Sequence, residues 1–138
     1  MKKVLILGAG LSGIGSAELA KRNSLDILLS ESNEIDAKIK SKLKKLDIEF
    51  EENSHTNAKT YSADVVIKSP GIPDESEIIN SLSKKGFSII SEIEFASLFS
   101  SKPAIGVTGS NGKTTTVTII HQLLNDANIN CSISGNIG

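Results

Sequence analysis

The stretch Val4-Leu5-Ile6-Leu7-Gly8-Ala9-Gly10-Leu11-Ser12-Gly13 decides the fold. Apolar residues are followed at once by the pattern G-x-G-x-x-G, which is typical of a buried strand that turns tightly into a helix. Glycines let the backbone approach a phosphate, and the first turn of a helix offers free N–H groups and a partial positive charge. The stretch therefore predicts a turn that binds a nucleotide or another phosphate compound; the alternative is a tight turn that binds nothing. NAD, FAD and other diphosphates all suit this pattern.

Outward from this stretch, short apolar runs alternate with helical patterns. Ile35, Ile39 and Leu43 recur at helical spacing, with lysines on the other faces. Strands that are buried on both faces of a parallel sheet give continuous apolar runs. The sequence therefore predicts an α/β fold with a Rossmann-like parallel sheet, whose strands are expected at Val4–Leu7, Ile27–Leu29, Val65–Ile67, Ser88–Ile90 and Ala104–Val107.

Capping and breaker signals divide the chain further. Asp74–Glu77 and Ser91–Glu94 each predict a capping box that opens a helix. The polar, proline-containing stretch Phe99–Pro103 predicts a boundary between a first domain at 1–98 and a second at 99–138. After it come an expected strand, a glycine loop, a helix at about Lys113–Asp126 and a short run at Asn130–Ile133. We expect this to be the opening of a second domain whose remainder lies outside the chain.

The glycine loop of this second domain is Thr108-Gly109-Ser110-Asn111-Gly112-Lys113-Thr114-Thr115. Backbone N–H groups of such a loop cradle phosphates, the lysine neutralises their oxygens and a hydroxyl ligates Mg²⁺. The strict phosphate-loop pattern requires glycine at position 107, where this chain has Val107. The G-x-x-G-K-T-T core between an expected strand and helix still predicts an ATP phosphate loop. The alternative is a helix N-terminus with a solvated lysine.

Composition excludes several classes of function. The chain has 138 residues and a net charge of −1, which argues against a general nucleic-acid or membrane-surface binder. No run approaches the ~18 apolar residues of a membrane span. Cys131 is the single cysteine, so no disulfide framework is possible, and the cytoplasm is the simplest location.

The presence of both glycine motifs on one chain narrows the function. A dehydrogenase uses the first motif and has no use for the second. A simple ATPase uses the second and does not need a preceding phosphate-binding domain. An enzyme that uses ATP to activate a substrate carrying its own nucleotide diphosphate needs both.

With both motifs in place, the sequence resembles the Mur ligase family, whose phosphate loop has the form T-G-[ST]-x-G-K-[ST]. Four features resemble the D-glutamate-adding branch of that family: Gly8–Gly13, Lys68–Pro73, Ser91–Phe95 and Gly135–Gly138. The L-alanine-adding branch usually has histidine where this chain has Asn111, and it remains an alternative. The resemblance spans nearly the whole chain.

The resemblance implies roles for particular residues. Gly10, Leu11 and Ser12 would hold a UDP diphosphate. Glu31, where the family usually has aspartate, would recognise uracil, with Ser32 beside it. Asn136 would face the substrate. The wall of the uridine site would be formed by Ser69, Pro70, Gly71 and Ile72. ATP would be held by Thr108, Gly109, Ser110, Asn111, Gly112, Lys113, Thr114 and Thr115. Lys113 and Thr114 would be catalytic, and Thr114 or Thr115 would ligate Mg²⁺.

The implied activity is an ATP-dependent ligase of peptidoglycan synthesis. ATP would phosphorylate the carboxylate of UDP-N-acetylmuramoyl-L-alanine, and the amine of D-glutamate would displace the phosphate. We expect a monomer without nucleic-acid or membrane partners, and no ligase activity in the 138-residue chain alone. A stand-alone UDP-binding module and an NAD-dependent oxidoreductase are the competing hypotheses.

Other polar residues are given structural roles. His55 is expected to be a solvated loop residue, and His121 a surface or packing residue. Cys131 is expected to be a small core residue. Glu92 and Glu94 are expected to cap a helix, with closure of the active site between domains as the alternative.

Overall fold

The structure is a computed structural model that describes residues 1–135. It divides into two compact units, Met1–Ser101 and Lys102–Gly138. The predicted boundary lies between residues 98 and 99. Each unit is described by itself.

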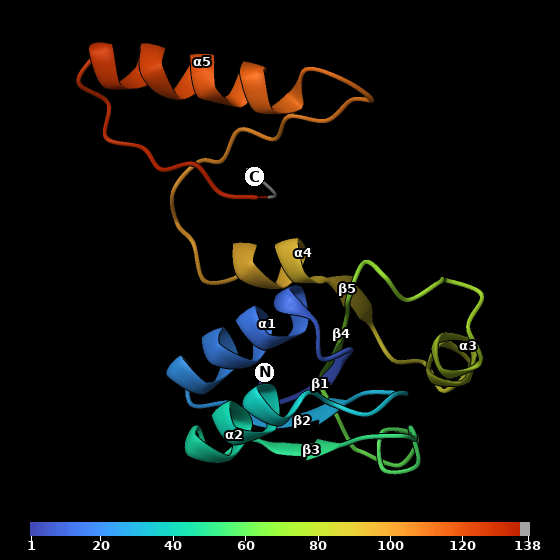
Figure 1. The fold of residues 1–138 in the computed structure, drawn as a ribbon. Helices are drawn as coiled ribbons and strands as arrows, with labels where there is room; N and C mark the ends of the chain where they lie inside the picture. The colour runs from blue at the N-terminus through green and yellow to red at the C-terminus, as the bar shows by residue number, and fades with distance from the viewer. Residues whose placement is uncertain (136–138) are drawn as a thin grey trace. The chain divides into compact units, whose positions relative to one another are not determined.

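The first unit is built on a five-stranded parallel sheet in the order β3-β2-β1-β4-β5 (Figure 1). The register places Leu5 of β1 opposite Leu28 of β2 and Val66 of β4. The order reverses direction between β1 and β4, which makes this the switch point of a doubly wound sheet. The predicted α/β class is confirmed. The strands are β1 (Lys3–Leu7), β2 (Asp26–Ser30), β3 (Glu49–Glu51), β4 (Val65–Lys68) and β5 (Ile89–Ser91).

Helices cover both faces of this sheet (Figure 1). They are α1 (Leu11–Arg22), α2 (Ala37–Lys45), α3 (Glu77–Lys84) and α4 (Glu92–Ser97). One core lies under α1, α2 and α4, where Val4 and Ile6 of β1 meet Phe95. A second core lies under α3, where Leu5 and Leu7 of β1 meet Leu82. Because successive strand residues point to opposite faces, burial of both faces requires the continuous apolar runs seen in the sequence.

In the first unit, one strand and one cap differ from the sequence predictions. β3, the edge strand Glu49–Glu51, was not predicted, because it is three residues long and two of them are carboxylates. The capping box at Ser91–Glu94 is confirmed. The box predicted at Asp74–Glu77 is wrong: α3 begins after Ser76, and the Asp74 carboxylate instead forms an ion pair of 2.7 Å with Lys68.

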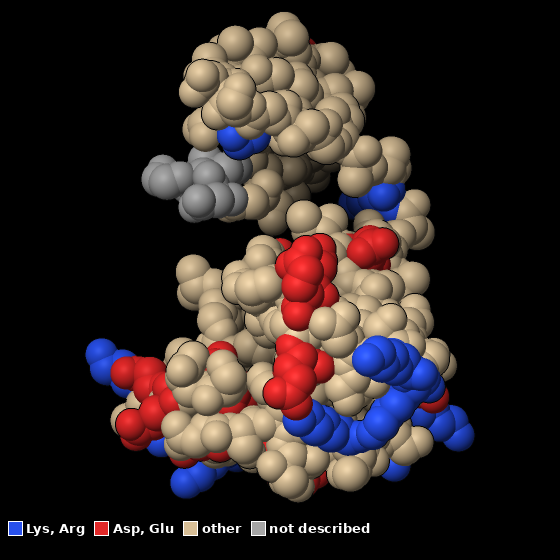
Figure 2. Space-filling view, turned by 90° about the vertical axis from the view of Figure 1, so that its right-hand side faces the viewer, with Lys and Arg blue, Asp and Glu red and all other residues tan. Residues whose placement is uncertain are grey.

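Charges of both signs occur on the first unit. Figure 2 shows acidic and basic side chains on the same face of it. Two lysines of α2 form ion pairs, Lys40 with Glu52 at 3.0 Å and Lys42 with Glu18 at 2.5 Å. Two of the five lysines of this helix are thus paired with carboxylates. None of the helices in residues 1–135 is long and apolar enough to cross a membrane.

The second unit contains α5, which spans Lys113–Asp126 as predicted. The strand predicted at Ala104–Val107 is wrong, and the run Asn130–Ile133 is not a strand. A strand needs a hydrogen-bonded neighbour, and the described part of this unit supplies none. None of the residues of α5 is buried.

Candidate functional site

The candidate site lies where the strands of the first unit end. Gly8 follows β1, Glu31 follows β2 and Ser69 follows β4. The carboxyl ends of parallel strands share one edge of the sheet, so these three residues border the switch point between β1 and β4. Open α/β sheets bind ligands in the crevice at this position.

The glycine turn is shaped by two of its glycines and left open at the third. Gly8 has φ +96° and its N–H donates to Ser30 O over 2.8 Å. A Cβ on Gly13 would lie 1.9 Å from Gly8 O, so close packing requires glycine there. A Cβ on Gly10 would meet no described atom within 4 Å. The turn is therefore held from behind, while its outer side is free for a ligand.

The first turn of α1 lies directly beyond Gly10. No side chain caps this helix, so its first N–H groups remain available to an anion. Leu11 is 97% exposed. The Ser12 hydroxyl donates to Glu92 Oε1 over 3.2 Å, which links α1 to α4. Glu92 therefore contacts the residue predicted to hold the diphosphate.

The Glu31 carboxylate fastens the turn to the end of β2. Its Oε2 accepts from Ala9 N–H over 2.8 Å. Its Oε1 accepts from the Ser32 hydroxyl and from the backbone and side-chain amides of Asn33, at 3.2, 3.0 and 3.3 Å. Burial would raise the pKa of Glu31, but these hydrogen bonds outweigh it and hold the pKa below its ordinary value. The group is an ionised acceptor with three hydrogen bonds at Oε1 and one at Oε2.

A cavity of about 300 Å³ opens beside the turn. Two hydroxyl oxygens near it, Ser69 Oγ and Ser76 Oγ, are buried without a hydrogen-bond partner in residues 1–135. Buried polar atoms are almost always paired, and Ser76 lines the cavity, so its hydroxyl is a candidate to bond a ligand there. The cavity is lined by Gly8, Glu31, Ser32, His55, Gly71, Ile72, Pro73, Ser76, Glu77 and Ile78.

The cavity brings together only part of the predicted set. Glu31, Ser32 and Gly71 line it, and the Ser69 side chain packs behind Gly8. Leu11 and Pro70 are exposed outside the lining, and Gly10 and Ser12 also lie outside it. Asn136 lies outside the described residues.

His55 also lines this cavity, and the expectation of a solvated loop residue is wrong. Its ring is half-buried, and Nδ1 lies 2.6 Å from Ser30 Oγ. Burial lowers the pKa of His55, against the opposing effect of the Glu51 and Glu31 carboxylates. The unpredicted strand β3 explains the error, because β3 carries the following loop to the same edge of the sheet as Glu31.

Glu51, the last residue of β3, anchors that loop. The residue is 8% exposed, and its carboxylate accepts from the N–H groups of Asn57 and Ala58 and from the Ser30 hydroxyl, at 2.8, 2.7 and 2.8 Å. Burial alone would raise the pKa of Glu51, but these hydrogen bonds bring the pKa below its ordinary value of 4.5. A carboxylate with a lower pKa in the folded state stabilises the fold while it is ionised.

We therefore expect Glu51→Gln to destabilise the chain by about 1–3 kcal/mol at pH 7, because backbone donors lose their charged acceptor. Ionised Glu51 contributes its full stability above the unfolded-state pKa, close to 4.5, and loses it as the pH falls through the lower folded-state pKa. The difference in unfolding free energy between wild type and variant should therefore become smaller below about pH 4.5. Urea unfolding at a series of pH values measures this difference. Glu49→Gln, an exposed change on the same strand, is the control and should behave like wild type. A gap that stays constant with pH would contradict this role of Glu51.

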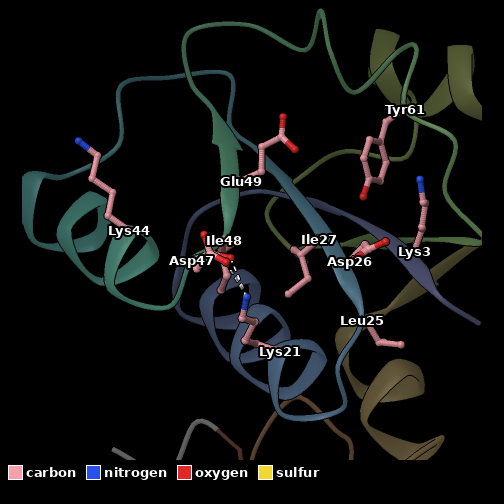
Figure 3. A pocket seen from close by; sticks show the side chains of 10 residues that line it. All are labelled: Lys3, Lys21, Leu25, Asp26, Ile27, Lys44, Asp47, Ile48, Glu49 and Tyr61. Atoms are coloured by element: carbon pink, nitrogen blue, oxygen red, sulfur yellow. Dashed lines mark hydrogen bonds and ion pairs between the residues drawn. The ribbon is translucent and has the colours of Figure 1, made fainter.

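A larger hollow of about 550 Å³ lies at the opposite edge of the sheet (Figure 3). Residues at the amino ends of the strands line it, among them Lys3, Asp26 and Glu49. Figure 3 shows the Lys21 amine bonded to Asp47 across one side, with an ion-pair distance of 3.4 Å. This hollow has no glycine turn, and the helix N-termini lie at the other edge, so it lacks the features of a phosphate site.

The second glycine loop lies in the other unit. Gly109 and Gly112 have φ values of +146° and +74°, and Gly112 is the N-cap of α5. The Lys113 amine donates to the Gly109 carbonyl and, over 3.4 Å, to the Ser110 carbonyl. No side chain caps α5, and Thr114 and Thr115 are exposed in its first turn. A cation, free N–H groups and two hydroxyls therefore lie together, which is a donor set that suits phosphate and Mg²⁺.

Fold and site together define an α/β domain of the Rossmann type, with a glycine turn and a cavity at the switch point. In comparison with known proteins, the MurD N-terminal domain matches residues 3–78. The chain belongs to this family, which confirms the resemblance to the Mur ligases.

Two ligases among the similar proteins agree with this membership, and a dehydrogenase shares the fold. A UDP-N-acetylmuramoylalanine–D-glutamate ligase from Christiangramia forsetii is 53% identical over 99% of the chain, and the chain spans 31% of the length of that relative. A solved murein peptide ligase from Psychrobacter arcticus matches with a TM-score of 0.66 and 25% identity, over 93% of this chain and 27% of the other. A prephenate dehydrogenase from A. aeolicus, solved with NAD⁺, matches with a TM-score of 0.50 and 26% identity, over 66% of this chain and 33% of the other.

Proposed function

We propose that Met1–Ser101 binds the uridine diphosphate part of UDP-N-acetylmuramoyl-L-alanine. In this proposal the chain is the substrate-binding part of an ATP-dependent ligase that joins D-glutamate to that substrate in peptidoglycan synthesis. The observation that carries it is the open glycine turn beside a cavity lined by a serine with an unpaired buried hydroxyl, in a chain 53% identical to a ligase of that name. By itself, the 138-residue chain should bind the substrate without ligating it.

The two ends of the ligand would occupy different parts of the site. The diphosphate would lie on the first turn of α1 at Gly10, Leu11 and Ser12, where uncapped N–H groups and the helix dipole attract anions. The nucleoside would enter the cavity between Glu31 with Ser32 and the segment Ser69–Gly71. Ser76 Oγ, which belongs to a residue of the cavity lining, would gain the partner that it lacks in the described structure.

ATP and Mg²⁺ are proposed to bind the second glycine loop. Bound ATP supplies the phosphoryl group that activates the substrate carboxylate. Lys113 would exchange the carbonyl groups of Gly109 and Ser110 for phosphate oxygens, and Thr114 or Thr115 would offer a hydroxyl to Mg²⁺. These residues position the reactants and neutralise charge. We further propose that the protein is cytoplasmic, since the UDP-linked substrate and ATP are both soluble compounds of that compartment. We also propose that it is a monomer.

A second candidate, an NAD-dependent oxidoreductase, is favoured by the likeness to the NAD⁺-bound dehydrogenase. NAD-binding domains of this fold use an acidic residue at the end of the second strand to accept hydrogen bonds from the ribose. Here the Glu31 carboxylate already accepts three hydrogen bonds at Oε1 and one at Oε2 from the protein, so little of it is left for a ribose. The chain is also 53% identical to a ligase whose name gives a UDP-linked substrate. We therefore prefer the uridine nucleotide.

A substitution at Ser12 tests whether the diphosphate lies on the first turn of α1. We expect Ser12→Asp to weaken UDP binding by about 1–3 kcal/mol in calorimetric titration, because it puts negative charge where the helix N-terminus attracts an anion. The new carboxylate would also lie near Glu92, so the matched control is Ser12→Asn, which has the same shape without the charge. Equal UDP affinities in the two folded variants would show that the diphosphate does not lie at this turn.

A further inference from the structure

The carboxylate of Glu92 borders the first turn of α1. Glu92 is the first residue of α4, which lies beside α1 in the first unit (Figure 1). The Ser12 hydroxyl, in the first turn of α1, donates to Glu92 Oε1 over 3.2 Å. Both residues are half-buried. A negative charge therefore lies within hydrogen-bond distance of a residue that is proposed to hold an anion.

The capping box of α4 and a buried aromatic side chain keep this carboxylate in place. Ser91 Oγ accepts from the Glu94 N–H over 3.1 Å, and Glu94 Oε2 accepts from the Ser91 N–H over 2.8 Å. Phe95, on the first turn of the helix, is fully buried in the core under α1. The backbone of Glu92 is thus held on both sides, which keeps its side chain near the first turn of α1.

No basic side chain of the first unit offsets this charge. Within Met1–Ser101, Glu92 forms no ion pair. The lining of the neighbouring cavity contains two more carboxylates, Glu31 and Glu77, and no lysine or arginine. The attraction for an anion comes from the N–H groups and the dipole of α1, which are equivalent to about half an elementary charge. A ligand that brings more negative charge to this turn is therefore disfavoured.

The charge of a diphosphate depends on whether its outer phosphate carries a sugar. In free UDP the outer phosphate is a terminal group whose second proton has a pKa of about 6, so it is mostly a dianion at pH 8. In a UDP-linked sugar the same phosphate is a diester and carries one charge. We infer that Glu92 repels the terminal phosphate dianion and thereby makes the site selective for UDP-linked sugars over free UDP. This inference rests on the proposed function.

The test is calorimetric titration of the 138-residue chain with UDP and with UDP-N-acetylglucosamine, at about pH 8 and low ionic strength, without divalent cations. Glu92→Gln removes the charge and keeps an oxygen that can accept from Ser12. The variant should bind UDP about three- to tenfold more tightly than wild type does, because the like-charge repulsion is lost. Its affinity for UDP-N-acetylglucosamine should rise by less, about twofold or below.

A matched control and a change of salt separate the effect of charge from an effect on structure. Glu49→Gln removes the same charge from an exposed residue at the opposite edge of the sheet, and it should leave both affinities unchanged. The gain in UDP affinity of Glu92→Gln over wild type should shrink in about 1 M salt, where the screening length falls to about 3 Å. A purely structural effect of the substitution would not depend on salt in this way.

Glu92→Asp covers the case in which Glu92→Gln does not fold. It keeps the charge but withdraws it from α1 by about one methylene group, so it should show a smaller gain in UDP affinity. An unchanged UDP affinity in a folded variant overturns the inference and leaves the diphosphate proposal standing. An equal gain for both ligands also overturns it, because Glu92 would then act on charge that the two ligands share. Failure of wild type to bind either ligand overturns both proposals.

Discussion

Gly13→Ala is expected to destabilise the first unit by about 3 kcal/mol or more. A Cβ at position 13 would lie 1.9 Å from Gly8 O, and that oxygen belongs to the backbone of the glycine turn. Side chains can rotate away from an added methyl group, but this backbone is held by the bond of Gly8 N–H to Ser30 O. When an added side-chain atom forces the backbone to move, the loss of stability lies at or above the upper end of the ~1–3 kcal/mol that is usual for overpacking. Urea unfolding followed by circular dichroism measures the change.

Gly15→Ala is the control for this prediction, because Gly15 lies on the same helix, is exposed, and has no described atom within 4 Å of its Cβ position. Alanine is the better helix former, so this variant should be as stable as wild type or up to about 1 kcal/mol more stable. Equal stability of the two variants would mean that α1 does not pack on the turn as described.

The second large effect is expected from Lys113→Ala, in a chain extended to the full length of the curated relatives. The change removes the cation of the second glycine loop and leaves the glycine backbone intact. N–H groups would still hold part of ATP, so its binding should weaken moderately. Charge grows on the phosphoryl oxygens during transfer, so the ligation rate should fall on the order of 10³-fold or beyond.

UDP binding should be nearly unchanged in Lys113→Ala, since residues of the first unit make that contact. Lys38→Ala, an exposed lysine at the start of α2, is the control and should leave both the rate and UDP binding intact. Loss of UDP binding with retained ATP turnover in Lys113→Ala would show that the two nucleotide sites are assigned the wrong way round.

The sheet and its helices were largely predictable from the sequence because their signals are local. Val4–Leu7 reads as a strand because both of its faces are buried, and the glycines that follow mark the turn. Ala104–Val107 carries the same kind of apolar run but forms no strand, because pairing depends on neighbours that a run of residues does not reveal.

The cavity wall was less predictable because its contacts join distant segments. Glu31 was expected at the site from its spacing, but its bond to Ala9 depends on how β2 ends beside the turn. His55 and Glu51 gave no local signal: β3 is too short to recognise, and its partners lie more than 20 residues away at Ser30. Side-chain networks of this kind become visible only once the strand order is known.

The central claim is that the glycine turn and the cavity hold a uridine diphosphate. Parallel calorimetric titrations of the 138-residue chain with UDP and with NAD test it most directly, because both ligands offer a diphosphate to α1 and differ in what they place in the cavity. We predict that UDP binds and that NAD binds more weakly, since the chain is 53% identical to a ligase whose name gives a UDP-linked substrate. Tighter binding of NAD than of UDP would contradict the ligase assignment and favour the oxidoreductase.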